Sequence, residues 1–466
     1  MTKLKTTLSK DLSACVELIK QLKNKNDVAH LMEVPAGQLL HILYDLPPDK
    51  QCKTFEIPKK TKGTRIIKAP IGSKRVLQNK LKPILGEMYR TKACVHGFVN
   101  NKSIVTNAHA HRKKRYVLNL DLKDFFPTIH FGRVQGLFKN YPFNMEHNAA
   151  TIMAEMCTQD GNLAQGSPLS PVLSNFIAAD LDKKMMAIAQ RYKLTYTRYA
   201  DDLTLSGSQK TFPRSVARWD GDSPITNEIV LGTVLTDAIV SAGFQINHDK
   251  IRMQIRSVRQ EVTGLTVNEF PNIPRSYIRN IRAMIHAWDK YGLVAAENKL
   301  IEKYTPPSQK KDTKQRDGKY FKSVLYGKIA FVKMVRGEED ELYMKLCLKA
   351  ASLDTSPPKF IQKIKHMHEK FDVFISHASE DKDDIVRPIY NELEKIGVTA
   401  FLDEVHMGWG DSLTEKINHA LGQSKFVLAV LSEASIDKKW PRKEINAALS
   451  REMAGKQKIL PLIVAE

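Results

Sequence analysis

Two adjacent aspartates lie between two short apolar runs near the middle of the chain, in the stretch Tyr199-Ala200-Asp201-Asp202. The flanking runs, 194–197 and 203–205, are rich in strand-forming residues, so the pattern predicts a β-hairpin with both carboxylates at its tip. Adjacent carboxylates repel each other, and a shared divalent cation would relieve this because hard cations prefer oxygen ligands. An isolated Asp-Asp pair is more often a solvated turn, so a metal site needs another carboxylate.

A third carboxylate ends another apolar run, Tyr116 to Asp121. A buried strand that delivers one Asp can meet a hairpin that delivers two. Three carboxylates can then hold two Mg²⁺ ions a few ångströms apart, an arrangement that stabilises in-line attack at a phosphate. The sequence therefore predicts a two-metal site formed by Asp121, Asp201 and Asp202.

Three motifs in this order resemble those of reverse transcriptases: Asp121 within Leu-Asp-Leu-Lys-Asp-Phe-Phe, the stretch Gln-Gly-Ser-Pro-Leu-Ser-Pro at 165–171, and Tyr-Ala-Asp-Asp. The resemblance implies an α+β right-hand polymerase with fingers, palm and thumb. It also implies that the three aspartates bind two Mg²⁺ ions and act on deoxynucleoside triphosphates.

The resemblance extends to the nucleotide site. It implies that Arg65, in a basic hairpin predicted over 54–67, neutralises the triphosphate, and that Gln165 and Gly166 shape the nucleotide and template site. Phe126 would exclude a ribose 2′-hydroxyl, and Lys250, in an Asn-x-x-Lys motif, would protonate the leaving pyrophosphate. From the residues alone, the hairpin could equally be a solvated turn, Phe126 a core residue and Lys250 a surface lysine.

Two shorter motifs resemble signatures of retron reverse transcriptases, the bacterial enzymes that copy part of their own non-coding RNA. One is Asn107-Ala108-x-x-His111 and the other is Val262-Thr263-Gly264. The resemblance implies that these residues recognise a structured RNA (msr-msd), which primes its own DNA copy and gives a branched RNA–DNA hybrid. A group II intron-like reverse transcriptase is the alternative within this class.

Charge divides the chain. Residues 1–365 hold 59 Lys and Arg against 34 Asp and Glu, whereas residues 366–466 hold 13 against 17. This contrast predicts a nucleic-acid partner for the first part only. We expect a reverse transcriptase over 1–350, with fingers and palm to about 265 and a thumb over about 270–350, and then a linker over 351–370 that contains Ser-Pro-Pro.

Several local expectations follow from periodicity. We expect one long helix over 172–190, a loop over 206–224 and a helix over 226–242. Further helices are expected over 276–289, 321–336 and 339–350, separated by a Pro- and Lys-rich stretch. No run of 18 apolar residues occurs, so we expect no membrane span, and five scattered cysteines indicate a cytoplasmic protein with reduced thiols.

Strands alternate with helices over 371–466, which predicts a parallel sheet in an open α/β fold. The residues there resemble TIR domains, including Asp-Val-Phe-Ile-Ser-His-Ala-Ser-Glu-Asp at 372–381 and Trp-Pro-Arg-Lys-Glu at 440–444. The resemblance implies a flavodoxin-like fold and self-association. In TIR enzymes a Glu on this helix cleaves NAD⁺, which implies catalysis by Glu444 and NAD⁺ binding by Phe374, Ser376, Trp409 and Trp440.

The sequence thus predicts a cytoplasmic retron reverse transcriptase fused to a TIR effector that cleaves NAD⁺ in anti-phage defence. Two other classes of function stay open. The TIR domain could be a pure interaction module, and the three aspartates could serve a nuclease. The Gln-Gly-Ser-Pro and Asn-x-x-Lys motifs argue against a nuclease, because a nuclease needs no triphosphate site.

Overall fold

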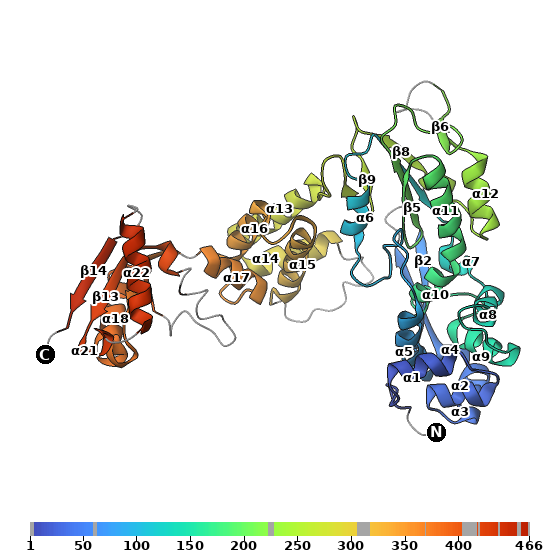
Figure 1. Ribbon diagram of the computed structural model, residues 1–466, viewed down its shortest axis with the longest axis horizontal. Coiled ribbons are helices and arrows are strands. Elements are labelled where there is room, and N and C mark those ends of the chain that lie inside the picture. Colours follow the sequence, from blue (N-terminus) through green and yellow to red (C-terminus); the bar gives the residue numbers. More distant parts are fainter. Residues whose placement is uncertain are drawn as a thin grey trace. The chain divides into compact units, whose positions relative to one another are not determined.

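The computed structural model describes residues 4–58, 63–221, 228–304, 317–368, 370–402, 417, 420–436, 439–453 and 458–464. The chain forms two compact units, one of Met1–Ile278 with Met334–Arg336 and the other of Arg279–Lys333 with Gly337–Glu466 (Figure 1).

A four-stranded antiparallel sheet lies at the centre of the first unit. Its strand order is β4-β5-β3-β8, with β3 Tyr116–Asp121, β4 Thr195–Tyr199, β5 Asp202–Gly207 and β8 Arg252–Ile255. The expected hairpin is confirmed, since β4 pairs with β5 in a register that sets Tyr199 opposite Asp202. Ala200 takes a left-handed conformation (φ 57°) in the turn, which is uncommon for a residue with a Cβ.

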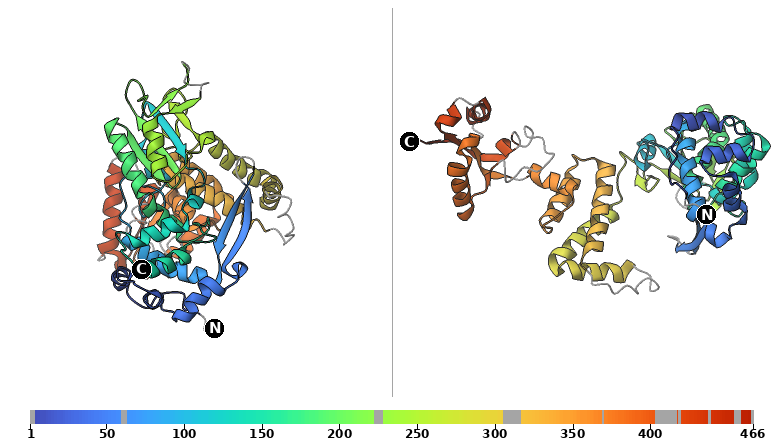
Figure 2. Two further views of the ribbon diagram at one scale, coloured as in Figure 1. Left: turned by 90° about the vertical axis from the view of Figure 1, so that its right-hand side faces the viewer. Right: turned by 90° about the horizontal axis from the view of Figure 1, so that it is seen from below.

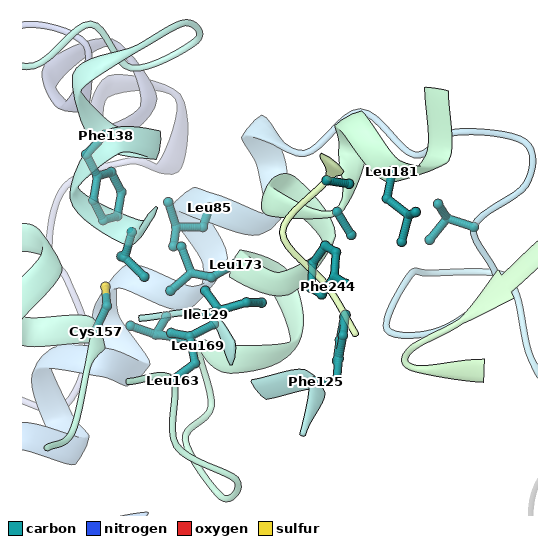
Figure 3. Packing of buried hydrophobic residues seen from close by; sticks show 14 of the residues in the cluster. Leu85, Phe125, Ile129, Phe138, Cys157, Leu163, Leu169, Leu173, Leu181 and Phe244 are labelled. Carbon is teal, nitrogen blue, oxygen red and sulfur yellow. The ribbon is translucent and has the colours of Figure 1, made fainter. Parts of the chain in front are cut away.

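One face of this sheet packs on the main hydrophobic core. Leu118, Leu120, Leu203 and Leu205 are all at most 2% exposed, and they alternate with polar residues that point to the other face. Helices α7 (Phe125–Thr128), α8 (Phe131–Lys139) and α10 (Ser170–Ile177) contribute to the same core. Figure 3 shows Phe125 beside Phe244, and the two rings stack with centroids 5.5 Å apart.

An antiparallel hairpin of β1 (Cys52–Pro58) and β2 (Thr64–Pro70) confirms the hairpin expected over 54–67 and projects as a long arm (Figure 2). The remaining elements of the first unit are α1 Leu12–Ile19, α2 Lys25–Met32, α3 Ala36–Leu40, the π-helix η1 His41–Asp45, α4 Pro48–Gln51, α5 Gly72–Met88, α6 Ile104–Ala110, α9 His147–Cys157, α11 Ala179–Arg191, α12 Thr233–Ser241, η2 His248–Lys250, β9 Glu261–Val262 and β10 Leu265–Thr266.

Three local expectations were wrong in detail. The helix expected over 172–190 is two helices, α10 and α11, which meet at Ala178. The loop expected over 206–224 contains β6 (Ala217–Trp219), which pairs with β7 (Ile229–Leu231). The helix expected over 226–242 begins only at Thr233, because the short apolar run before it forms a strand, and residues 222–227 lie outside the described part.

Helices form the first part of the second unit, although the first turn of α13 and the last residues of α15 belong to the first unit. These helices are α13 Arg275–Tyr291, α14 Leu293–Tyr304, α15 Lys319–Arg336, α16 Glu341–Ala351 and α17 Lys359–His368. Helix α14 was not expected. Helix α17 lies inside the segment expected to be a linker, and its Ile361 and Ile364 are at most 1% exposed. That spacing of three residues buries one apolar face, so most of the segment is ordered helix.

A parallel sheet follows, as expected, with the order β12-β11-β13-β14. Its strands are β11 Phe371–Ser376, β12 Ala400–Phe401, β13 Ser424–Leu431 and β14 Lys458–Ile463, and its helices include α18 Arg387–Lys395, α21 Glu433–Ile436 and α22 Lys439–Met453. Apolar residues are buried on both faces, with Phe374 in one cluster and Val373 in the other. Among the described residues, no helix is long and apolar enough to cross a membrane.

Candidate active sites

The three predicted carboxylates meet at one end of the antiparallel sheet. Asp121 ends β3 and is paired in register with Asp202, the first residue of β5. The Leu122 backbone N–H donates to the Asp201 carbonyl at 3.0 Å, which joins the end of β3 to the turn. The strand end and the hairpin tip therefore come together as the sequence predicts.

The carboxylates influence each other. Desolvation, together with the negative charges of Asp201 and Asp121, raises the pKa of Asp202 to about 7, although the Asp202 side chain reaches solvent at the turn. Burial also raises the pKa of Asp201, and the positive charges of Lys250 and Arg65 oppose that rise. Without a cation, the site holds more negative charge than its surroundings stabilise.

Asp121 has two partners in this structure. Lys250 Nζ donates to its Oδ2 at 2.8 Å and Asn247 Nδ2 to its Oδ1 at 3.0 Å. Asp121 is 7% exposed, whereas the Lys250 side chain is about half exposed. Within the described residues, no group of three or more His, Cys, Asp or Glu side chains is already arranged to hold a metal ion.

A buried ion pair supports the hairpin tip. Arg198, just before the motif, is fully buried and binds Asp182 with two hydrogen bonds, Nε to Oδ1 and Nη2 to Oδ2, both 2.8 Å long. Its Nη1 donates to Asn175 Oδ1 at 3.0 Å and to the Ala200 carbonyl at 3.3 Å. A Cβ on Gly97 would lie 2.5 Å from the Ala200 nitrogen, so only glycine allows this approach.

The predicted nucleotide residues surround a junction between the β1–β2 arm and the Gln165 loop. The Lys68 backbone N–H donates to the Gln165 carbonyl at 2.9 Å. Gly166 has φ 119°, and a Cβ there would lie 2.8 Å from the Lys68 carbonyl oxygen. Arg65 is exposed on β2, and Phe126 is half-buried beside Phe98, with ring centroids 6.1 Å apart.

The structure buries most of the two short signature motifs. Asn107, Ala108, His111 and Val262 have no exposed surface, whereas Gly264 is exposed and Thr263 half-exposed. The Asn107 amide has no hydrogen-bond partner among the described residues. Buried side chains cannot touch RNA in this conformation, so any contribution of Asn107 or His111 to RNA recognition is indirect.

In the parallel-sheet domain, Ser376 Oγ donates to Glu444 Oε2 at 2.8 Å. Ser376 ends β11 and Glu444 lies on α22, so the pair sits at the carboxyl ends of the strands, where such sheets bind ligands. A second pair, Ser432 Oγ donating to Asp381 Oδ2 at 2.6 Å, follows β13.

Of the other residues expected to bind NAD⁺, only Phe374 has a side chain within the described part of the structure. Phe374 is 2% exposed and stacks on Phe401 in the core, with centroids 5.3 Å apart, so its side chain is not available to a ligand in this conformation. Trp440 belongs to α22, and Trp409 lies outside the described residues.

Comparison with known proteins identifies both parts. The family model described as reverse transcriptase (RNA-dependent DNA polymerase) matches residues 57–267, and the TIR domain model matches 373–466. The Retron Mx65 reverse transcriptase of Myxococcus xanthus is 31% identical over 337 residues, with 68% of this chain and 70% of the relative covered. The chain belongs to the retron reverse transcriptase family.

A second retron reverse transcriptase, Ec86 of Escherichia coli, is 30% identical over 57% of this chain and 78% of its own length. The C-terminal part is 41% identical to the 2′ cyclic ADP-D-ribose synthase AbTIR of Acinetobacter baumannii, over 23% of this chain and 40% of that relative. This chain thus spans less than half of the length of that TIR relative.

Sequence reasoning gave no role to several residues of this retron-family site, namely Gly97, Asn175, Asp182 and Arg198. It placed Asn247 in the Asn-x-x-Lys motif but did not predict the bond that Asn247 donates to Asp121. One signal was available: Arg198 is a charged residue inside an otherwise strand-like run, and a charge at such a position needs a buried partner. Nothing in the sequence named Asp182 or Asn175 as that partner.

Proposed function

We propose that this chain copies its own structured RNA into DNA, with Asp121, Asp201 and Asp202 as the ligands of two Mg²⁺ ions. The observation that carries the proposal is the meeting of Asp121 with the Asp201-Asp202 turn at one end of one sheet. Under this proposal the sheet is the palm, the β1–β2 arm belongs to the fingers and the helices from α13 belong to the thumb.

The carboxylates suit divalent cations. Burial and the neighbouring carboxylates raise the pKa of Asp202 to about 7, and a cation bound there would favour the ionised carboxylate and lower that pKa. When bound, two Mg²⁺ ions would stabilise the attacking and leaving oxygens of an in-line displacement at phosphate. Asn247 and Lys250 already hold Asp121 by both carboxylate oxygens, which fixes its orientation.

The chain's own residues would bind the nucleotide. Arg65 is exposed on β2 and its charge reaches Asp201, so its guanidinium can bind phosphate oxygens. Gly166 allows the loop backbone to lie against β2, and Phe126 is half-exposed beside Phe98, where a ring can meet a sugar. Lys250 is half exposed and can turn from Asp121 towards a pyrophosphate oxygen to donate a proton.

The partner would be the msr-msd RNA and its DNA copy. Family membership and the positive excess before residue 366 support this, because Lys and Arg neutralise phosphates. Five buried cysteines without disulfides support a cytoplasmic location, where thiols stay reduced. Restraint of the TIR domain by the hybrid, and its release during phage infection, belong to the same proposal.

We infer that the TIR domain cleaves NAD⁺ with Glu444. The 41% identity to a 2′ cyclic ADP-D-ribose synthase and the location of Glu444 at the carboxyl ends of parallel strands support this. A carboxylate there would stabilise the positive charge that develops on the ribose when nicotinamide leaves. Glu444 is only 8% exposed, so we expect its carboxylate to become accessible to NAD⁺, and the domain to become active, only after domains associate. An interaction module without activity is the alternative.

Primer extension tests the polymerase proposal. Asp201→Asn combined with Asp202→Asn should abolish DNA synthesis while the purified protein keeps its bound RNA, because the change removes charge and also relieves repulsion. Sequencing the nucleic acid that copurifies with the wild-type protein should reveal one structured RNA joined to DNA. Continued synthesis by the double variant would refute the assignment of these residues.

A further inference from the structure

One face of the central sheet carries a continuous row of polar side chains. Alternation along the strands sends the leucines of β3 and β5 to the core and the residues between them to the opposite face. Asp121 and Asp202 form one end of this row, paired across the strands. The residues that continue it down the sheet are Asn119 on β3, Thr204 and Ser206 on β5, and Thr197 on β4.

His111 joins the two strands of the catalytic hairpin across this face. Its Nδ1 shares a hydrogen bond of 2.7 Å with Ser206 Oγ on β5, and its Nε2 one of 2.7 Å with Thr197 Oγ1 on β4. The imidazole has no exposed surface, and burial lowers its pKa to about 3. It is therefore neutral, with one nitrogen donating and the other accepting, and both are used.

The Val262–Gly264 turn reaches the same row. Glu261, one residue before the turn, accepts a hydrogen bond through its carbonyl from Asn119 Nδ2 at 2.9 Å. Asn119 Oδ1 in turn accepts one from Thr204 Oγ1 at 3.2 Å. This chain of bonds connects the turn with β3 and β5, which carry Asp121 and Asp202.

The two signature motifs are also bound to each other, although more than 150 residues separate them. Helix α6, which carries Asn107, contacts β4, β9 and β10. Thr263 takes a left-handed conformation (φ 46°), strained for a β-branched residue, and its Oγ1 donates to the Ile104 carbonyl at the start of α6 at 3.3 Å. Both motifs thus form one support on the catalytic face of the sheet.

We propose that the Asn107–His111 and Val262–Gly264 motifs together hold the catalytic hairpin in register, with His111 as a positioning residue for DNA synthesis. The proposal rests on the assignment of Asp121, Asp201 and Asp202 to the polymerase site. The sequence motifs do not distinguish between two roles, shaping the active site and binding RNA, and the proposal does. His111 serves the first role, because the bonds of its ring all go to the strands of the hairpin.

The test uses a template that the protein does not select, an oligo(dT)-primed poly(rA), together with the RNA that copurifies. His111→Ala should lower kcat on the homopolymer by one to two orders of magnitude, the size expected when reacting groups are misplaced. The KM for dTTP and the Kd for the copurified RNA should change less than about threefold. His109→Ala is the matched control, since His109 is exposed on the same helix, and it should change none of these values.

If His111→Ala does not fold, variants of the two residues that bind the His111 ring can test the proposal instead. Ser206→Ala and Thr197→Val each remove one hydroxyl that the ring binds, and either should lower kcat severalfold. Combining Ser206→Ala with His111→Ala should add little, because both remove one interaction. His111→Gln should recover part of the lost kcat, as an amide can donate to one hydroxyl and accept from the other.

Three results would overturn the proposal. The first is a His111→Ala variant with full kcat on the homopolymer but weaker RNA binding, which would mean that the motif binds RNA. The second is a loss of kcat fully explained by a lower melting temperature, and the third is additive losses of kcat for His111→Ala and Ser206→Ala. Failure of the polymerase assignment is separate, because it would appear as DNA synthesis by the Asp201→Asn, Asp202→Asn variant whatever His111 does.

Discussion

The buried ion pair behind the hairpin tip allows stability and catalysis to be separated. Arg198 and Asp182 are both fully buried and joined by two 2.8 Å hydrogen bonds. Arg198→Met removes the cation and leaves the Asp182 carboxylate in the interior, where Tyr196 OH is its remaining donor. Breaking one side of such a pair costs about 3–5 kcal/mol, so we expect a loss of that size in the unfolding free energy of the first unit.

The double variant Arg198→Met, Asp182→Leu should recover most of that loss, because apolar residues of similar volume often replace a buried pair without a penalty. DNA synthesis should not recover, since the Arg198 bond to the Ala200 carbonyl is still missing and the turn that carries Asp201 has lost that support. Lys184→Met is a matched control, because its ion pair with Asp180 lies at the surface of the same helix and contributes little.

Hydrogen exchange of the β4 and β5 amides gives the unfolding free energy of this unit separately from the rest of the chain. Primer extension on the same samples gives the rate. Two outcomes would refute the reasoning. If the double variant is as unstable as the sum of both single variants, the two charges do not compensate each other. If it is stable and fully active, the contact with Ala200 does not position the turn.

Three further predictions concern single residues. Phe126→Ala should admit ribonucleotides in an incorporation assay and lower stability by less than the roughly 3–5 kcal/mol of a fully buried Phe, because Phe126 is only half-buried; a large drop in melting temperature without ribonucleotide use would identify it as core. Glu444→Gln should abolish NAD⁺ loss in clustered protein and leave DNA synthesis intact; equal NAD⁺ loss would exclude Glu444. His111 has a pKa of about 3 in the folded protein and about 6.5 in the unfolded protein, so between these values it takes up a proton only on unfolding. Its contribution to the free energy of unfolding is therefore complete above pH 6.5 and falls by about 1.4 kcal/mol per pH unit below it. His111→Gln should flatten the dependence of stability on pH between about 6.5 and 4, and an unchanged slope would contradict the burial argument.

The sequence predictions that the structure confirms rest on patterns that span only a few neighbouring residues. The Asp201-Asp202 turn was predictable because alternation and turn chemistry act over a few residues, and the parallel sheet because its strands and helices alternate. Ile229 to Leu231 was misassigned to a helix because a short apolar run fits either structure. Ser-Pro-Pro suggested a linker over 351–370, yet α17 begins directly after Pro358, because Ile361 and Ile364 give the helix a face that can be buried.

Contacts between distant segments could not be predicted in the same way. Arg198 on β4 pairs with Asp182 on the helix α11, and His111 binds residues of two strands that lie 86 and 95 residues away in the sequence. The sequence marked His111 only as part of a signature. Its burial and both of its partners depend on how α6 packs on the sheet, which a pattern of residue types does not determine.

The close approach of Gly166 to β2 has a mechanical consequence. The backbone bond from Lys68 to Gln165, and the lack of space for a Cβ at Gly166, lock the inner end of the β1–β2 arm to the loop. A swing of the arm about this end would break that hydrogen bond. Whatever bending admits or retains a nucleotide must occur further out, near Phe55, Ile57 and Ile66, whose side chains are 41–55% exposed and have few neighbours to resist the motion. We therefore expect the outer half of the β1–β2 hairpin to bend more easily than the end that is bonded to the Gln165 loop.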